Sequence, residues 1–120
     1  MARLQPIRIG DTFEREYRFY NAIPDTDPPV ADTNNPIDLT DIIVTFHLRI
    51  GAVTHDFDGS AGVTVTPEDG QVNIELEAEQ TADFKRDNEA ESYLLFEYAD
   101  GNEKTKAHRA ERVLPRYEIR

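Results

Sequence analysis

Few side chains of this sequence are suited to covalent or acid–base catalysis. The chain has no cysteine, so Ser60, Ser92 and the threonines are the available nucleophiles, and neither serine lies in a Gly-x-Ser-x-Gly turn. The histidines are His47, His55 and His108, and His47 has the solvent-facing parity of its segment, as a surface histidine does. No catalytic triad can be assembled, and we expect the protein not to be an enzyme.

One short acidic segment is similar to the start of a calcium-binding loop. Asp56-Phe57-Asp58-Gly59 offers two carboxylates, and His55 is a further ligand type beside them. The third oxygen ligand and the terminal bidentate Glu of such a loop are missing. Asp-Gly clusters usually form turns in which the Asp side chain bonds to nearby backbone. We therefore expect neither a metal ion nor a cofactor.

A second acidic group consists of Glu75, Glu77 and Glu79, whose spacing places side chains on one face of a strand. Paired carboxylates act as acid and base only where a pocket separates their pKa values, which an open ridge does not do. The pattern is typical of a solvated surface, with docking against a basic partner as the alternative.

The overall charge narrows the choice of partner. The 120 residues include 24 acidic and 13 basic ones, a formal net charge of −11. Such a field repels phosphate, and the sequence suggests no Lys and Arg cluster for binding through counterion release, so neither nucleic acid nor membrane is an expected partner. Residues 1–6 lack the apolar stretch of a signal peptide, and no segment reaches the roughly 20 apolar residues that cross a bilayer. We expect synthesis and folding in a cytosol.

Alternation of apolar and polar residues predicts the strands that position these groups. Residues 13–20 place Phe13, Tyr17 and Phe19 on one parity, and residues 42–50 alternate so regularly that they are the expected central strand. Further strands are predicted at 53–57, 63–65, 71–76, 93–98 and 105–114.

Turn signals separate these strands. Residues 67–70 and 100–102 predict tight turns, and residues 78–85 break the alternation and predict one short helical turn. Residues 21–36 contain four prolines and no periodicity, so a long polar loop is expected there, either disordered at its tip or a contact element.

The length and the spacing of these elements predict the fold class. A chain of 120 residues fits one domain with one core, spanning residues 1–120. Short strands with turn signals every 8 to 12 residues or so are typical of a sandwich or barrel. About seven strands favour an all-β, immunoglobulin-like antiparallel β-sandwich.

Several short motifs follow one another along the chain. They are Gly10-Asp11-Thr12-Phe13 with Phe19 and Asn21, Pro36-Ile37-Asp38-Leu39-Thr40 before Val44-Thr45-Phe46-His47-Leu48-Arg49, Gly62-Val63-Thr64-Val65, Asp69-Gly70, Leu76, Gln80-Thr81-Ala82, Tyr93 and Asp100-Gly101. This succession resembles a family of short bacteriophage proteins that includes the N-terminal domain of the baseplate upper protein. The resemblance implies a virion component with an immunoglobulin-like domain.

The chain departs from the family pattern at three points. Asp41 stands where the family usually has Gly, the connection at residues 21–36 is long, and no tail domain follows Arg120. We therefore expect a stand-alone version of the domain, placed in the tail, the baseplate or the head-to-tail region.

The leading hypothesis is a structural protein of a tailed-phage virion, made and assembled in the host bacterial cytoplasm. It would contact other phage structural proteins in symmetric multiple copies. Long loops and chain ends readily order on a neighbour, so contacts are expected in residues 21–36 and at the ends, in residues 1–6 and 116–120. The residues expected to touch partners are Asp25, Asp27, Pro28, Pro29, Asp32, Arg116, Tyr117 and Arg120.

The alternative is a carbohydrate-binding β-sandwich that recognises a host surface through aromatic rings. The tyrosines are Tyr17, Tyr20, Tyr93, Tyr98 and Tyr117. All five lie in or beside apolar strands, so packing in the core or on a sheet is the favoured prediction for them. An enzyme is the third hypothesis.

Overall fold

The computed structural model describes residues 5–115, and most of its regular structure is β-strand. Within that range the strands are β1 (Ile7–Arg8), β2 (Phe13–Arg18), β3 (Tyr20–Ala22), β4 (Ala31–Pro36), β5 (Ile43–Ile50), β6 (Val53–Phe57), β7 (Val63–Thr66), β8 (Gln71–Leu76), β9 (Asp87–Glu97) and β10 (Glu103–Leu114). A 3₁₀ turn (Pro67–Asp69) and the helix α1 (Ala78–Thr81) complete the elements. The helix α1 has four residues and is the single α-helix in residues 5–115. No helix in this range is long and apolar enough to cross a bilayer.

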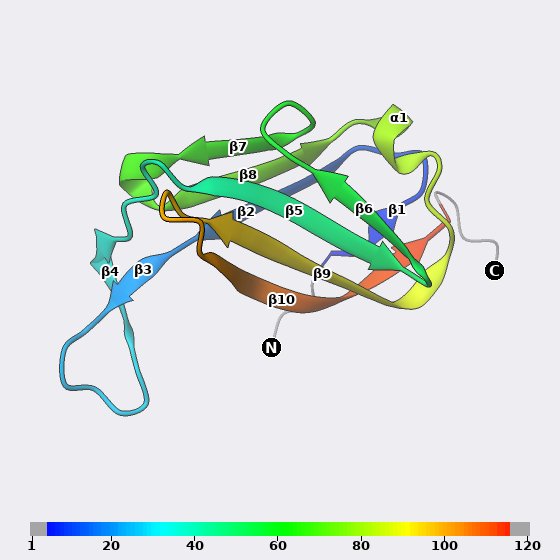
Figure 1. Cartoon of the computed structure of the whole chain (residues 1–120). Coiled ribbons are helices and arrows are strands. Elements are labelled where there is room, and N and C mark those ends of the chain that lie inside the picture. The colour runs from blue at the N-terminus through cyan, green and yellow to red at the C-terminus, as the bar shows by residue number, and fades with distance from the viewer. Residues whose placement is uncertain (1–4, 116–120) are drawn as a thin grey trace.

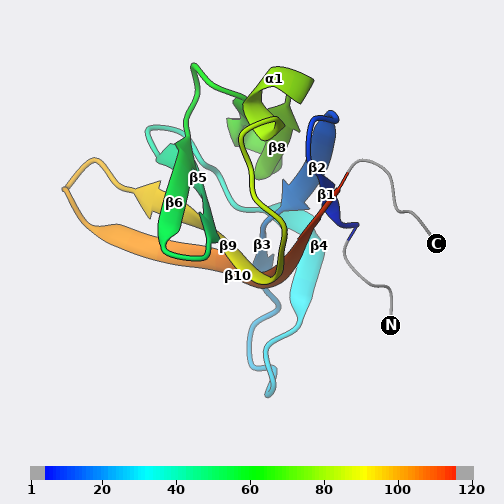
Figure 2. The same ribbon diagram turned by 90° about the vertical axis from the view of Figure 1, so that its right-hand side faces the viewer.

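Two sheets pack face to face (Figures 1 and 2). The larger sheet has the order β1-β10-β9-β5-β6 and the smaller one β2-β8-β7. Among the described strands, β1 and β10 pair parallel, and all the other pairs are antiparallel. The predicted all-β sandwich is confirmed, although β9 rather than β5 is the middle strand of the larger sheet.

Inward-facing side chains of both sheets form the core. Phe46 and Leu48 of β5 and Val72 and Ile74 of β8 are fully buried, as the alternation in both segments predicts. Burying an aliphatic or Phe side chain stabilises the fold by about 1.5–3 kcal/mol. The other members of the core are Ile7, Phe13, Leu39, Val44, Ile50, Phe57, Val63, Leu76, Phe84, Ala90, Leu94, Phe96 and Val113.

The prediction of a loop throughout residues 21–36 is wrong. β3 and β4 pair as an antiparallel hairpin, with Tyr20 opposite Pro36 and Ala22 opposite Ala31, and only residues 23–30 are irregular. Most of the hairpin is exposed on both sides, so burial imposes no alternation on its sequence. The predicted strand at 13–20 is correspondingly divided, since β2 ends at Arg18 and β3 begins at Tyr20. We call residues 20–36 the arm.

The remaining connections form largely where they are predicted. The 3₁₀ turn ends at Gly70, whose φ of 61° is in the left-handed region that favours glycine. The helical turn is shorter than residues 78–85, and the Glu77 and Gln80 side chains cap its first turn reciprocally. β9 begins at Asp87, six positions before the predicted start, because its first half alternates only weakly.

Candidate protein-binding surfaces

The arm projects from one end of the sandwich (Figure 1). Its irregular tip is closed by Thr26, whose hydroxyl donates to the Ile23 carbonyl at 2.8 Å and accepts from the Val30 N–H at 3.2 Å. The Ile23 N–H donates to the Val30 carbonyl at 2.8 Å. These bonds give the tip a defined shape although little of it is buried.

The surface of the arm is both acidic and apolar. It carries Asp25, Asp27 and Asp32 and contains no Lys or Arg. Ile23 and Val30 at the tip are 40% and 49% exposed, and the only other exposed large hydrophobic residues in the described range are Ile43 and Val53. Exposed apolar groups on a projecting element are features of interaction sites.

The structure brings several of the predicted contact residues together in the arm. Asp25, Asp27, Pro28 and Pro29 are exposed at the tip, where Asp25 has a φ of 60°. Asp32 lies on β4, is partly exposed, and accepts a hydrogen bond from the Asn34 N–H at 3.1 Å. Arg116, Tyr117 and Arg120 lie outside the described residues, as do residues 1–4 of the predicted N-terminal contact.

The base of the arm is held to the body by backbone hydrogen bonds. The Phe19 N–H donates to the Gly70 carbonyl and the Ile37 N–H donates to the Phe19 carbonyl, both at 2.9 Å. Leu39, next to the base, is buried, and its N–H donates to the Pro67 carbonyl at 3.0 Å. The arm therefore has a fixed base and an exposed tip.

A basic surface that the sequence interpretation missed lies on β10. Four of the 13 Lys and Arg residues fall within nine positions of this strand, so the expectation that cations are not clustered is wrong. We call this surface the β10 edge; its residues are Lys104, Lys106, Arg109 and Arg112. The signal was present in the sequence, but the net charge of −11 hid it.

The β10 edge has no strand partner along most of its length. β9 covers one side of β10, whereas β1 covers the other side only at Val113 and Leu114. Figure 1 shows β10 running along the margin of the larger sheet. Ala107, with a φ of 53°, produces a bulge between Lys106 and Arg109. Charged side chains and bulges are the features with which edge strands avoid unwanted strand pairing.

A buried ion pair fixes β10 against the smaller sheet. Arg15 of β2 donates two hydrogen bonds to Glu111 of β10, at 2.5 and 2.9 Å, and their side chains are 10% and 0% exposed. Burial alone would lower the pKa of Arg15, but the hydrogen bonds to Glu111 and Tyr17 raise the pKa above its ordinary value. Ser92 of β9 donates a third hydrogen bond to Glu111. The pairing was not predicted, because Arg15 and Glu111 are far apart in the sequence.

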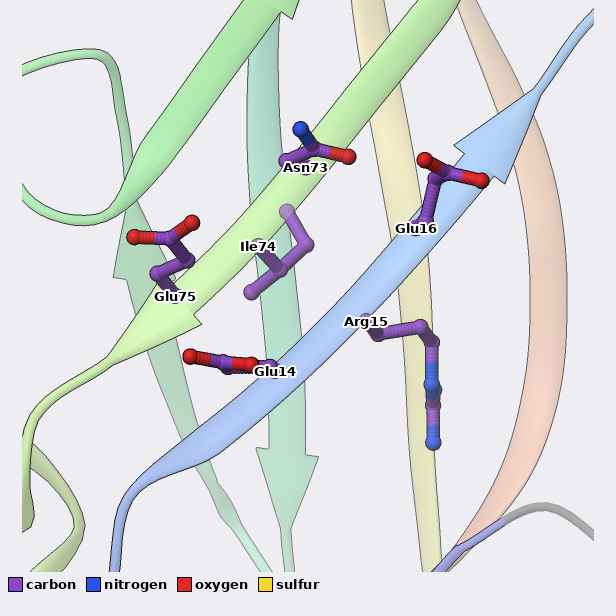
Figure 3. A pocket seen from close by; sticks show the side chains of 6 residues that line it. All are labelled: Glu14, Arg15, Glu16, Asn73, Ile74 and Glu75. Carbon is purple, nitrogen blue, oxygen red and sulfur yellow. The ribbon is translucent and has the colours of Figure 1, made fainter.

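The outer face of the smaller sheet is acidic. Glu14 lies directly opposite Glu75 across β2 and β8, and Glu16 lies opposite Asn73. Figure 3 shows these four side chains around a shallow hollow, with Arg15 pointing away from them. The predicted ridge of Glu75, Glu77 and Glu79 does not form, because β8 ends at Leu76 and the two later glutamates belong to the start of α1.

His47 lies on the outer face of β5, as its parity predicts, but it is not a freely exposed histidine. Its side chain is only 14% exposed, Nδ1 contacts the Asp56 carboxylate, and the ring stacks on Tyr93 with centroids 4.8 Å apart. Its Nε2 atom is buried without a hydrogen-bond partner. The Asp56-His47-Tyr93 row spans three strands and packs as a cross-strand cluster.

The segment that is similar to a calcium loop forms the predicted turn. Asp58 accepts hydrogen bonds from the Ser60 hydroxyl at 2.6 Å and the Ser60 N–H at 2.9 Å. Both bonds favour the carboxylate and lower the pKa of Asp58. In residues 5–115, no three His, Asp or Glu side chains gather closely enough to hold a metal ion.

The described tyrosines are partly buried against neighbours. Tyr17 stacks on Phe19, with ring centroids 6.5 Å apart, and Tyr93 stacks on His47. The ammonium group of Lys104 lies 5.9 Å from the Tyr98 ring centroid. Packing against neighbouring side chains, as predicted, accounts for these three rings. Tyr20 is partly buried on β3 opposite Pro36, and Tyr117 lies outside the described range.

No protein-family model matches the chain, and a search of curated proteins finds no match either. The arm and the β10 edge are therefore the features from which its function is inferred.

Proposed function

We propose that this chain is a structural protein of a tailed-phage virion that acts through protein–protein contacts in the tail, baseplate or head-to-tail region. The observation that carries the proposal is the arm, a hairpin with a fixed base and an exposed tip that bears apolar and acidic side chains. A projecting element of this kind is suited to hold a neighbouring subunit.

The resemblance to the short phage proteins supplies the virion context. The strand order supports the same proposal, because it is compatible with an immunoglobulin-like domain. Strands β10, β9, β5 and β6 follow one another as G, F, C and C′ do in a variable-type domain, and β2, β8 and β7 follow one another as B, E and D. On this correspondence the arm is an insertion between strands B and C.

The contacts are proposed to be repeated in symmetric multiple copies on other phage structural proteins, after synthesis in the host bacterial cytoplasm. Repetition makes weak single contacts sufficient, since each further contact forms at high effective concentration. Neither nucleic acid nor a membrane is part of the proposal.

Mass spectrometry of purified particles tests the proposal directly. We expect peptides of the untagged chain at a fixed ratio to the major tail or head protein, and incomplete or non-infectious particles after deletion of the gene. A chain absent from purified particles, together with normal assembly in the deletion, would contradict the proposal. A strain that produces the chain without its arm tests whether the arm makes the contacts. Particles of that strain should lack the chain or assemble poorly.

A further inference from the structure

The arm and the β10 edge have opposite charge, and the charged side chains of both lack ion-pair partners among the described residues. Among the described residues, no ion pair joins any of the four cations of the β10 edge to a carboxylate, although the chain has 24 acidic residues. The three aspartates of the arm also lack a cationic partner in that range. Each surface is therefore complementary to the other.

The two surfaces do not meet within one chain. The arm is held at its base by the hydrogen bonds of Phe19 and Ile37, and it extends away from the sandwich (Figures 1 and 2). The strands β3 and β4 contact each other far more than either of them contacts a strand of the body. Pairing of the arm with a β10 edge therefore requires a second molecule.

We propose that the arm of one copy docks on the β10 edge of a second copy of this chain. Asp25, Asp27 and Asp32 would face Lys104, Lys106 and their neighbours, and the contact would bury part of Ile23 and Val30. The inference deepens the proposed function, on which its biological setting rests, by naming a second copy as one partner.

Docking through side chains fits the geometry of the β10 edge better than strand addition does. The bulge at Ala107 interrupts the regular backbone that an added strand would require. Long Lys and Arg side chains reach an acidic partner without backbone pairing. Salt should then weaken the contact, because exposed charge pairs are screened.

The symmetry of the contact follows from the difference between the two surfaces. If two copies share a single arm–edge contact, one arm and one edge stay free and the interface is heterologous, which generates closed rings or open filaments depending on the rotation between copies. Two reciprocal contacts would instead close a two-fold dimer. This kind of assembly agrees with a role in a symmetric particle.

A charge-swap experiment on the purified chain tests the inference. In the arm variant D25N/D27K/T33K the arm becomes basic. Asn replaces Asp25 because it also tolerates the left-handed conformation there, and Asp32 keeps its bond to the Asn34 N–H. In the edge variant K104E/K106E the two lysines proposed to face the arm become glutamates, and the β10 edge loses its net positive charge. Sedimentation velocity at low salt, at up to about 1 mM protein, should show self-association of the wild type and at least about tenfold weaker association of each variant.

The decisive measurement is made on the equimolar mixture of the two variants. Two arm–edge pairs are then complementary, the basic arm of the first variant with the glutamates of the second variant's β10 edge, and the unchanged arm of the second variant with the unchanged edge of the first. The mixture should therefore associate although neither variant does so alone. The control E79K/D83K changes two exposed carboxylates at α1, away from the arm, and should associate normally. A circular dichroism spectrum and the milder set D25N/D27N/D32N, which should also weaken association, guard against a misfolded arm variant.

A wild type that stays monomeric at all these concentrations would overturn the inference. So would association that survives in both variants, or a mixture of folded variants that does not associate. Binding of the arm to a basic partner other than this chain would appear as a monomeric wild type and would also overturn it. Presence of the chain in particles is measured separately. A chain that is monomeric in solution but present in virions would overturn the inferred self-association and leave the proposed function intact.

Discussion

At the scale of single residues, the Arg15–Glu111 pair is the most consequential polar contact of the sandwich. It joins β2 of the smaller sheet to β10 of the larger one with both side chains almost fully buried. A buried pair is not necessarily more stable than apolar residues in its place, but removal of one partner leaves the other charge buried and unpaired. Its main effect is to fix the position of β10, and with it the β10 edge.

Arg15→Met should lower the free energy of unfolding by about 3–5 kcal/mol, because Glu111 then remains buried without its cation. Urea titrations followed by circular dichroism measure this change. The matched control is Arg18→Met, since Arg18 pairs with Glu16 on the surface, where both side chains are about half exposed. That change should leave the free energy of unfolding nearly unchanged, because exposed ion pairs contribute little. Equal losses in the two variants would show that burial of the Arg15 pair has no energetic consequence.

Asp38 gives a pH-dependent prediction at the same scale. The Thr40 hydroxyl and the Thr40 N–H donate to its carboxylate and lower its pKa in the folded chain. A carboxyl group with a lowered folded pKa contributes stability above its unfolded pKa of about 3.9, and this is lost as pH falls through the folded value. Asp38→Asn should therefore lose less stability than the wild type between about pH 5 and pH 2. A steeper loss in the variant would contradict the assignment.

At the scale of elements, Gly70 connects the 3₁₀ turn to β8 beneath the base of the arm. A Cβ atom at this position would lie 2.5 Å from the Phe19 carbonyl oxygen and 2.8 Å from that of Ile37, in addition to the strain of a φ of 61°. Backbone atoms cannot move aside as a flexible side chain can. The tight approach explains why the base of the arm requires glycine opposite it.

Gly70→Ala should cost roughly 3 kcal/mol or more, since the left-handed conformation alone costs about 1–2 kcal/mol. Gly101→Ala is the control, because Gly101 also has a positive φ, of 88°, but a Cβ there meets nothing within 4 Å. It should lose only about 1–2 kcal/mol. Thermal and urea unfolding of both variants measure the difference, and similar losses would show that the close approach is relieved cheaply.

The tip of the arm should be dispensable for the fold of the body. Replacement of residues 23–30 by Asn-Gly joins Ala22 to Ala31 with a two-residue hairpin turn, because these residues are already paired. The replaced residues are mostly exposed, so we expect the free energy of unfolding to change by less than about 1 kcal/mol. Urea unfolding of the purified variant measures it. A large loss would mean that the arm is part of the folding unit rather than an element for contacts.

At the scale of the whole molecule, the net charge of −11 opposes folding through self-repulsion. Like charges are even placed directly across strands, as with Glu14 and Glu75 on the outer face of the smaller sheet. The buried Arg15 pair is screened by salt much less than these surface charges are.

An increase in NaCl from about 10 mM to about 500 mM should therefore raise the urea midpoint of dilute, monomeric protein, because the Debye length falls from about 30 Å to below 10 Å. Glu14→Gln should reduce the increase, since it removes one member of the Glu14–Glu75 pair. A midpoint that falls with salt would contradict the prediction. Salt should act in the opposite direction on self-association, so the two effects can be distinguished.

The sequence by itself determined the strands that form most of the core, and most of the turns. Alternation in residues 42–50 and 71–76 identified which side chains face the core, because one face of each strand is buried and the period of a strand is two. Pro67 and Gly70 identified a turn through conformational preferences that act locally. Where no core covers a strand, as in the arm, the same reasoning failed, since burial then selects no pattern.

Only the tertiary structure decided which strands lie at an edge and which residues meet across the core. Arg15 shares the inward parity of Phe13 and Tyr17, but its partner Glu111 is 96 positions away, and no local pattern encodes that distance. The cations of β10 are visible in the sequence, yet their position along a largely unpaired side of the larger sheet depends on the strand order. Strand order results from the packing of the whole chain, so the two surfaces proposed to bind each other became recognisable only in the folded molecule.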